Sequence, residues 1–326
     1  MTLSAAEKLR RFYDQFSGED NVLIVINADP DAIASAMAVK RLLWRKVSGV
    51  TISNINIIKR PDNIAMIRLL GVELVPIKDI VKDRFTRFVI VDSQPDHNEI
   101  FAEFPPDVVI DHHPETDVHA NFSDIRPKYG ATASIMTEYI RAAKIKPSAK
   151  LSTGLFYAIK TDTCNFERQT LIEDVRAFQF LYRYANIHLA RKIEQSEIRL
   201  DFLKYFKSAL ENRRMRKGKI FAHLGTVVNP DICVLIADFF MKINSANWSI
   251  VSGLYNKKLV IVFRNDGLRK DAGKVAKLSF GSGGGHKSMA RAEIPFTDLK
   301  EVVDYKDEKK LLRWIINKIE KKAGKK

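Results

Sequence analysis

Acidic and histidine side chains follow separate apolar runs in the first half of this 326-residue chain. The residues that could do chemistry there are Asp29, Asp31, Asp92, Asp111, His112, His113 and Asp162. In an open parallel sheet, ligands bind beyond the carboxyl ends of the strands, so we expect these side chains to converge. Converging anions are costly unless a cation neutralises them. Several carboxylates and an imidazole suit a divalent metal of the Mn²⁺ type, and two such ions about 3.5–4 Å apart can hold a phosphoryl group.

Each of these residues also has a purely structural interpretation. An Asp that ends a strand is often the N-cap of the next helix, which applies to Asp29 or Asp31 taken alone. A His-His pair among seven histidines is weak evidence by itself. Their shared position behind apolar runs favours a metal site over coincidence.

Short β-branched runs must position these side chains, and such runs are typical of strands buried on both faces of a sheet. The runs are "VLIVI" (22–26), "FVIVD" (88–92), "VVID" (108–111) and "LVIVF" (259–263). Helical patterns at 32–47 and 63–71 alternate with the early runs. This alternation predicts an α/β fold with a largely parallel sheet.

The second half of the chain is expected to form a smaller α/β domain. Residues 171–215 have a helical pattern without interior Pro or Gly, which indicates the end of the first domain and a helical connector. Strands are predicted near 219–223, 231–236, 249–255 and 259–263, before a glycine-rich turn at 280–288. The predicted divisions are a first domain at 1–190, a connector at 191–216, a second domain at 217–299, and a basic C-terminal helix or tail at 300–326.

The composition is that of a globular protein with a large excess of positive charge. The mean hydropathy is −0.17, the formal net charge is +15 and the pI is about 9.6. Nucleic acid, nucleotides and anionic membrane surfaces all favour such a charge. Part of the excess lies at 306–326, where the apolar residues at helical spacing are Leu311, Leu312, Ile315, Ile316 and Ile319. This pattern favours a surface helix with a solvated face over a binding helix.

Export and membrane insertion are not expected from this sequence. The start of the chain is amphipathic and charged, with no apolar core of signal-peptide length. The apolar runs are far shorter than the roughly 18 residues of a membrane span. Only Cys164 and Cys233 are present, so neither a disulfide framework nor a CxxC zinc site can form. We therefore expect a cytoplasmic protein without a membrane span.

Taken together, the motifs resemble those of the DHH phosphoesterases over nearly the whole chain. The resemblance rests on "ADPDAIASA" (28–36), "VDSQ" (91–94), "VVIDHHP" (108–114), "GATASIMTEYI" (130–140), "IKTDTCNF" (159–166) and "GGGHKSMA" (283–290). The last motif is similar to the DHH-associated C-terminal domain. The chain thus resembles the two-domain branch of oligoribonucleases and phosphoadenosine-phosphate phosphatases, which implies an active site in the cleft between the domains.

This resemblance implies a set of metal ligands. Asp92 would bridge two Mn²⁺ ions, and Asp29 would hold the first of them. Asp31, His112 and Asp162 would complete the second site. A hydroxide between the ions would be the nucleophile, since the metals lower its pKa.

The resemblance also implies contacts around the metals and to the substrate. Asp111 would orient or assist the metal cluster, and His113 would face the scissile phosphate. In the second domain the glycine-rich loop would bind the substrate phosphate through Gly284, Gly285 and His286. Backbone N–H groups of such a loop suit an anion. Arg264, after the last apolar run, would be a further phosphate contact, with an ordinary surface arginine as the alternative.

One position departs from that branch of the family. Most members have a His four residues before the first Asp, and Val25 occupies this position here. The stretch from Asn27 to Asp31 is more similar to the first motif of RecJ-type exonucleases, which has three alternating acids, but Asn27 replaces the first of these. An Asn carbonyl can ligate a hard cation without adding charge. The first metal site is therefore expected to be weaker than in relatives.

The function predicted from these features is that of a Mn²⁺-dependent phosphodiesterase or phosphatase. Its expected substrates are short oligoribonucleotides, linear or cyclic dinucleotides, or 3′-phosphoadenosine 5′-phosphate. The alternatives are a RecJ-type single-strand exonuclease and a nucleotide-binding protein with weakened catalysis. A basic nucleic-acid-binding protein is a third alternative, although aromatic residues do not cluster with the lysines as a stacking platform would require. Nucleic acid remains a candidate partner, and a homodimer is left open.

Overall fold

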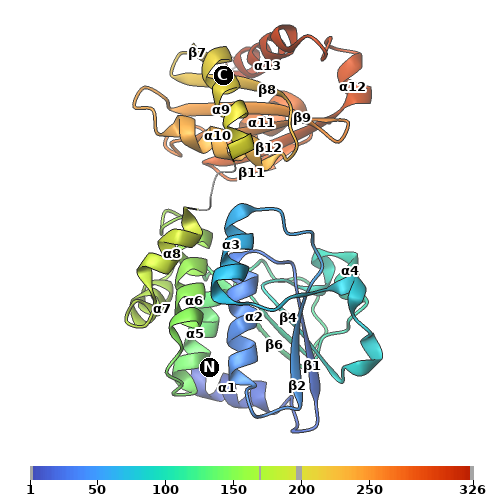
Figure 1. The fold of residues 1–326 in the computed structure, drawn as a ribbon, viewed down its shortest axis with the longest axis vertical. Helices are drawn as coiled ribbons and strands as arrows, with labels where there is room; N and C mark the ends of the chain where they lie inside the picture. The colour runs from blue at the N-terminus through green and yellow to red at the C-terminus, as the bar shows by residue number, and fades with distance from the viewer. Residues whose placement is uncertain (1–2, 169, 196–199, 324–326) are drawn as a thin grey trace. The chain divides into compact units, whose positions relative to one another are not determined.

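The computed structural model describes residues 3–168, 170–195 and 200–323 (Figure 1). The chain forms two compact units, Met1–Glu197 and Ile198–Lys326. The boundary between them falls inside the predicted connector, of which residues 196–199 lie outside the described residues, as do residues 324–326 of the predicted tail. Among the described helices, none combines the length and the apolar character needed to cross a membrane.

The first unit contains a sheet of six parallel strands in the order β3-β2-β1-β4-β5-β6. The strands are β1 (Asn21–Ile26), β2 (Gly49–Asn54), β3 (Val75–Pro76), β4 (Arg87–Val91), β5 (Val108–Asp111) and β6 (Phe122–Ile125). The three apolar runs predicted as strands in this half of the chain are β1, β4 and β5. These neighbouring central strands are buried on both faces, which explains their continuous β-branched sequences. The predicted parallel α/β sheet is confirmed.

Helices cover the two faces of this sheet unequally. On one face, the β1 residues Val22, Ile24 and Ile26 pack against helices and form the large core of this unit. The helices of that core are α1 (Ala5–Tyr13), α2 (Pro30–Leu42), α3 (Pro61–Leu70), α5 (Thr132–Ala142), α6 (Ala149–Asp162), α7 (Ile172–Tyr182) and α8 (Ile187–Glu194). The opposite face packs a small apolar cluster against the short helix α4 (Glu99–Ala102) and the residues that follow it.

The second unit contains a mixed sheet in the order β11-β12-β10-β9-β8-β7. Its strands are β7 (Arg214–Arg216), β8 (Lys219–Thr226), β9 (Trp248–Tyr255), β10 (Lys258–Asn265), β11 (Gly283–Gly285) and β12 (Met289–Pro295). Only the β8–β9 pair is parallel among the described strands of this sheet. One face packs against α9 (Leu203–Asn212) and α10 (Asp231–Met241), and the other against α11 (Ala272–Phe280), α12 (Phe296–Lys300) and α13 (Glu308–Ala323).

Two predictions about this half of the chain are wrong. Residues 231–236 form the start of helix α10 and not a strand. Its buried residues Ile232, Cys233, Ile236, Ala237 and Phe240 recur at helical spacing, which a continuous apolar run conceals. The stretch 171–215 contains α7, α8 and α9, as its helical pattern predicts, but its last two residues belong to strand β7, where no strand was predicted. The apolar residues of α13 pack into the core of the second unit, as a surface helix requires.

Candidate metal centre

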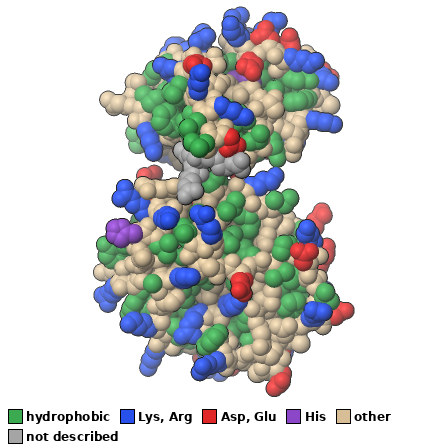
Figure 2. All heavy atoms as spheres, in the orientation of Figure 1, with side chains coloured by type: hydrophobic (Ala, Val, Ile, Leu, Met, Phe, Trp, Pro, Cys, Tyr) green, Lys and Arg blue, Asp and Glu red, His purple; other side chains and the backbone are tan. Residues whose placement is uncertain are grey.

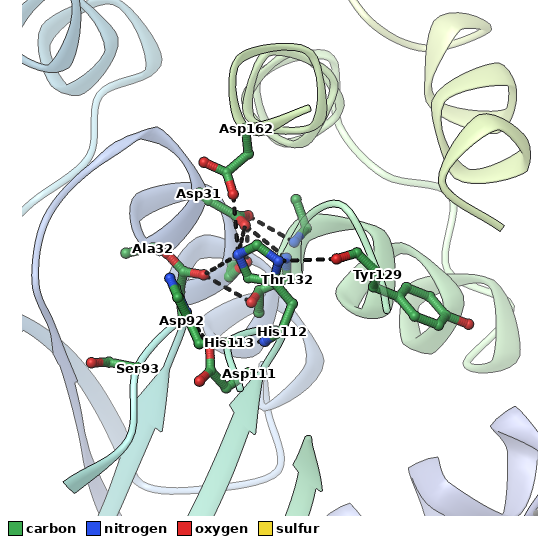
Figure 3. Close-up of polar contacts among 12 residues, drawn as sticks. Asp31, Ala32, Asp92, Ser93, Asp111, His112, His113, Tyr129, Thr132 and Asp162 are labelled. Atoms are coloured by element: carbon green, nitrogen blue, oxygen red, sulfur yellow. Dashed lines mark hydrogen bonds and ion pairs between the residues drawn. The ribbon is translucent and has the colours of Figure 1, made fainter. Parts of the chain in front are cut away.

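The carboxyl ends of β1, β4 and β5 bring most of the predicted site residues together. These three strands are adjacent in the sheet. Asp92 directly follows β4, and Asp111 is the last residue of β5. Asp31 lies in the first turn of α2, which follows β1. Asp162 is the last residue of helix α6, so the apolar segment before it is helical, and its side chain reaches the same place from that helix (Figure 3).

The ring of His112 lies at the centre of this cluster (Figure 3). Its Nε2 atom is 3.1 Å from Oδ2 of Asp162, 3.5 Å from Oδ1 of Asp92 and 3.9 Å from Oδ2 of Asp31. Its Nδ1 atom lies 3.1 Å from the carbonyl oxygen of Tyr129, to which it donates a hydrogen bond when it carries the proton. Nε2 is buried and has no hydrogen-bond partner among the described residues. A buried, unpartnered imidazole nitrogen facing three carboxylates is a metal-ligand geometry.

The N-terminus of α5 holds two of the carboxylates in place. Asp31 accepts hydrogen bonds from the backbone N–H groups of Thr132 and Ala133, both at 2.7 Å, and from the hydroxyl of Ser35 at 3.3 Å. Asp92 accepts a hydrogen bond of 2.9 Å from the hydroxyl of Thr132. The positive end of the helix dipole stabilises these anions. The sequence motif "GATAS" thus orients two carboxylates that lie far away in the sequence.

The backbone of Asp92 is itself unusual. Its φ of 58° lies in the left-handed region, which non-glycine residues rarely adopt. The Asp92 N–H group donates to the carbonyl of Ile110 in the neighbouring strand, and this bond helps to fix the conformation. Such outliers cost about 1–3 kcal/mol and concentrate at functional sites.

Burial and the proximity of other carboxylates raise the pKa of three acids. The pKa of Asp31 is raised to about 7, first by burial and then by the charge of Asp162. The pKa of Asp92 is raised well above its usual value by burial and by Asp31, and burial also raises the pKa of Asp29. Burial alone would lower the pKa of His112, but Asp162 and Asp31 outweigh it and raise this pKa to about 9. A divalent cation would displace protons from such groups, so the donor set fits a metal.

Asp111 is a buried supporting residue whose two carboxylate oxygens both accept hydrogen bonds. Its Oδ1 accepts from Nδ1 of His113 and from the backbone N–H of His112, both at 2.8 Å. Its Oδ2 accepts from the side-chain amide of Gln94 at 2.6 Å. Burial raises the pKa of Asp111, but the hydrogen bonds from His113 and Gln94 outweigh burial and lower it. Asp111 therefore orients His113, whose side chain is half exposed and lies beside the ring of His112.

Gln94 is a site residue to which the sequence analysis assigned no role. Its side chain is fully buried, and its Oε1 accepts from the backbone N–H and the hydroxyl of Thr116, at 2.7 and 2.9 Å. Its amide also donates to the carbonyl of Pro114 at 3.0 Å. Gln94 thus links Asp111 to the loop after His113. Its place in the motif "VDSQ" is the sequence signal that could have identified it.

A second unassigned residue, Asp174, holds the turn before α5. Its Oδ2 accepts from the backbone N–H groups of Gly130 and Leu171, at 3.0 and 2.8 Å. A Cβ at Gly130 would lie 2.6 Å from the side chain of Thr163, so only glycine fits this turn without a shift. The same turn presents the carbonyl of Tyr129 to His112.

The residues predicted for the first metal ion are less well assembled. Asp29 is the N-cap of α2, and its Oδ1 accepts from the N–H of Ala32 at 2.9 Å. Asn27 is exposed after the end of β1. Val25 is fully buried in the small apolar cluster on the α4 side of the sheet, beside Leu23. The structural interpretation of Asp29 as a helix cap is therefore realised, and it does not exclude a metal contact by the other oxygen.

Three triads of ligand atoms are close enough to share an ion, with all atoms of a triad within 4.8 Å of one another. They are Asp31, His112 and Asp162; Asp92, His112 and His113; and His97, Asp111 and His113. The first two overlap with the predicted ligand set. His97 was not predicted, and its Nδ1 lies 3.2 Å from the hydroxyl of Ser93 and from the N–H of Gln94.

The predicted substrate residues of the second unit lie at one end of its sheet. Gly284 and Gly285 form part of β11, and His286 follows it exposed to solvent. A Cβ at Gly285, whose φ is 148°, would lie 2.3 Å from the carbonyl oxygen of Met289, so the loop requires glycine there. Arg264 near the end of β10 forms an ion pair of 2.6 Å with Asp238 of α10. It is thus a paired arginine in this structure.

Comparisons with known proteins agree with this architecture. Residues 21–159 match the family described as "DHH family, N-terminal domain". An uncharacterized protein of Methanocaldococcus jannaschii is 38% identical over 293 residues, which cover 89% of this chain and 61% of that protein. The chain thus spans about three-fifths of the length of this curated relative.

Solved structures with the same arrangement of elements are more distant in sequence. An exopolyphosphatase-related protein from Bacteroides fragilis has a TM-score of 0.73 and 16% identity, with 98% of each chain covered. RecJ from Thermus thermophilus in complex with Mn²⁺ has a TM-score of 0.53 and 12% identity, with 99% of this chain and 55% of that chain covered. At such identities the likeness concerns the fold.

Proposed function

Because residues 21–159 match the N-terminal domain of the DHH family, we propose that the chain is a metal-dependent phosphoesterase of this family. The observation that supports this proposal is the unpartnered Nε2 of His112, which is buried among the carboxylates of Asp31, Asp92 and Asp162. The three carboxylates around that nitrogen distinguish it from an ordinary buried histidine, because converging buried anions are costly unless a cation neutralises them. Manganese as the ion, nucleotides as the substrates and a cytoplasmic location are the finer parts of the proposal.

The residues of the first unit would have distinct roles in hydrolysis. Asp31, Asp92, His112 and Asp162 would hold the cations, with Asp29 as a further ligand. A divalent cation at this site supplies Lewis-acid stabilisation of a phosphate and lowers the pKa of bound water. α5 keeps the carboxylates of Asp31 and Asp92 oriented, so the site needs little reorganisation when it is loaded.

His113 would contact the substrate phosphate. The hydrogen bond to Asp111 raises the pKa of His113, which favours the charged imidazolium. A cationic donor forms short, strong hydrogen bonds to phosphate oxygens. In the second unit, the backbone N–H groups around Gly284, Gly285 and His286 would bind a substrate phosphate, and Arg264 would do so after exchanging its bond to Asp238.

The test is a hydrolysis assay with the whole chain. Purified protein is incubated with Mn²⁺ and a panel of labelled di- to pentaribonucleotides, linear and cyclic dinucleotides, and 3′-phosphoadenosine 5′-phosphate. We expect hydrolysis of at least one substrate class, and its loss on chelation by EDTA. Mn²⁺ binding is measured in parallel by calorimetry, so that the metal site is tested without reference to turnover.

A matched pair of variants completes this test. Asp92→Asn removes a predicted ligand, whereas Asp96→Asn removes an exposed carboxylate from the same loop. We expect the first to abolish hydrolysis and weaken Mn²⁺ binding, and the second to change neither. Nucleotide binding without hydrolysis in wild-type protein would instead support the nucleotide-binding alternative, and equal behaviour of the two variants would contradict the metal centre.

A further inference from the structure

The two units differ completely in charge. Residues 1–197 contain 26 Lys and Arg residues and 26 Asp and Glu residues, so their formal net charge is zero. Residues 198–326 contain 28 basic and 13 acidic residues, so this smaller unit carries the whole net charge of +15. Lys and Arg side chains are spread over the face of the second unit that Figure 2 shows. An excess of this size, confined to one unit, indicates a polyanionic partner.

Basic residues from segments far apart in the sequence lie together at one end of the strands of the second sheet, where β8, β9 and β12 begin and β7, β10 and β11 end. The turn between β7 and β8 is joined to the loop before β9 by the bond from the N–H of Asn247 to the carbonyl of Gly218. That loop is joined to the residues after β10 by the bond from the N–H of Asp266 to the carbonyl of Asn247. The N–H of Asn265 then donates to Ser288, directly after the glycine-rich loop. We call this row of strand ends, which runs across the sheet from β11 to β7, the basic rim.

The basic rim is rich in cations that have no acidic partner. Its exposed or half-buried basic residues are Lys217, Lys219, Arg269, Lys270 and Lys287. None of them forms an ion pair with a carboxylate in the described part of the chain, whereas Arg216 pairs with Glu320 at 3.4 Å. Partial burial and the charges of Lys270 and Lys217 lower the pKa of Lys219, and they outweigh the opposite effect of Glu320. Lysines that repel one another at one edge are stabilised by a bound anion.

The acids near this edge are already engaged. Asp266 accepts from the N–H of Leu268, and Asp271 caps helix α11 through the N–H of Lys274. The C-terminal end of α13 lies beside the rim, because Glu320 reaches Arg216, and this end adds the exposed Lys318 and Lys321. The basic side chains of the rim outnumber these acids and Glu320, so a net positive charge remains there.

We propose that the basic rim binds the phosphate backbone of single-stranded nucleic acid that is longer than a dinucleotide. The rim crosses five gaps between strands, or about 24 Å at a spacing of about 4.8 Å. With one phosphate per about 3.4 Å of a stacked strand, this length corresponds to about seven nucleotides. The proposal rests on the proposed function and extends its substrates from short oligonucleotides to strands of about seven nucleotides or more.

Apolar side chains on the rim favour nucleic acid over inorganic polyphosphate. Leu268 is 76% exposed beside Arg269 and Lys270, and Met215 is 50% exposed in the β7 strand. Polyphosphate offers only oxygens to such side chains, whereas nucleic acid offers sugar and base surfaces. Contacts to the phosphate backbone would be independent of sequence, since phosphate oxygens carry no sequence information.

The test is a binding measurement in EDTA, so that its result does not depend on hydrolysis. Fluorescence anisotropy is recorded with labelled single-stranded RNA of about 4, 8 and 16 nucleotides, which bracket the length of the rim. We expect affinity to rise from the shortest to the longest RNA and to fall with salt. Polyphosphate with the same number of phosphates serves as the competitor, and we expect it to displace RNA more weakly than unlabelled RNA does.

A matched pair of triple variants locates the binding surface. The rim variant is Lys217→Asn, Lys219→Gln and Lys270→Gln, in which Asn before Gly218 preserves the left-handed turn. The control variant removes three exposed lysines from the opposite end of the sheet and the elements beside it: Lys257→Asn, Lys300→Gln and Lys306→Gln. The logarithm of the binding constant falls linearly with the logarithm of the salt concentration, and each phosphate contact to a single strand adds about 0.7 to the steepness of this line. We therefore expect the steepness to decrease by about 2 in the rim variant only.

The possible results separate this proposal from the proposed function. Equal effects of the two triple variants would show that only net charge matters and would overturn the basic rim. Affinity independent of RNA length, or stronger displacement by polyphosphate, would overturn it as well. A loss of RNA affinity in the rim variant alone supports the proposal. This holds even if the wild-type protein hydrolyses none of the nucleotides in the panel, a result that would overturn the proposed function and not the basic rim.

Discussion

His112 in the first unit and His223 in β8 of the second have the same hydrogen-bonding pattern at their ring nitrogens, but only His112 is surrounded by carboxylates. In each ring Nδ1 has a partner, the carbonyl of Tyr129 or, at 3.0 Å, the hydroxyl of Ser252. In each ring Nε2 is buried without a partner among the described residues. Burial lowers the pKa of His223 to about 4, whereas carboxylates raise the pKa of His112 to about 9 against the effect of burial.

The difference shows what turns an orphaned imidazole nitrogen into a candidate ligand. Desolvation acts in the same direction on both rings, because it disfavours the charged form. Only His112 has anions around it, and those anions need a cation as much as the nitrogen does. His223 lies in a strand within the second unit, where a neutral ring is the stable state. Geometry alone therefore does not identify a metal site.

The largest expected effect comes from removing one anion beside His112. Asp92→Asn should lower hydrolysis by about 10³-fold or more, because several kcal/mol of charge stabilisation are lost. In EDTA the same variant should unfold at a higher temperature, since one of several repelling buried carboxylates is gone. Asn also tolerates the left-handed backbone of Asp92. Thermal unfolding with EDTA and with Mn²⁺ checks both parts, and lower stability in EDTA would contradict the mutual repulsion.

A new histidine on the apolar side of the sheet should behave like His223 and not like His112. Val25→His restores the residue type that the family has at this position, but the side chain enters an apolar cluster with Ile90, Phe101 and Phe104. We expect the free energy of unfolding to fall by about 3–4 kcal/mol from overpacking and polar burial. The Mn²⁺ concentration for half-maximal activity should not decrease. Val25→Leu controls for size, and a lower Mn²⁺ requirement in Val25→His would show that this position reaches the metal.

The neutral ring of His223 should make the second unit sensitive to acid. Its pKa is lowered from 6.5 to about 4 on folding, so the unfolded chain binds a proton that the folded chain rejects. Stability is then complete above pH 6.5 and is lost as the pH falls toward 4, by roughly 3 kcal/mol at most. His223→Asn should remove this part of the pH dependence. Denaturant unfolding from pH 7.5 to 4.5 checks it, and identical pH profiles for the two proteins would refute the lowered pKa.

The smallest of these effects concerns a residue that acts through His113. Gln94→Met removes the hydrogen bond to Asp111 while it preserves side-chain volume, so the turn after His113 loses its support. We expect hydrolysis to fall by about 10–100-fold, as for other partners of site residues. The loss should lie in kcat more than in KM, with Mn²⁺ affinity unchanged. A pH–rate profile identical to that of wild type would argue that Gln94 only stabilises the fold.

The sequence predicted which of these side chains converge where a local pattern carried the information. Asp92 and Asp111 end β-branched runs, and parallel strands necessarily bring such ends to one edge. Asp162 joins them from a helix, because its placement depends on how α6 packs and not on the preceding run. The roles of Gln94 and Asp174 are tertiary, since their partners lie in distant segments that no local period reveals.

Other features could not be predicted from the sequence, because they depend on how distant segments pack together. The apolar stretch 231–236 fits a strand or a helix, and only packing against the second sheet decides for the helix. Alternation along β1 placed Val25 on one face, but it could not show that this face is an apolar core. The total charge was visible from composition, whereas its confinement to one unit depends on where the units divide.

The hydrogen bonds from α5 to Asp31 have a consequence for the order of folding. The residue before α5 is Ala131, which has no side chain to cap the helix, and Asp31 caps it instead from about a hundred residues away. A cap that depends on closing so long a loop forms late. The chain loses conformational entropy when the loop closes, before the hydrogen bonds of the cap can stabilise it. In pulse-labelling hydrogen exchange, the amides of Thr132 and Ala133 should therefore gain protection only after β1 and α2 are already protected.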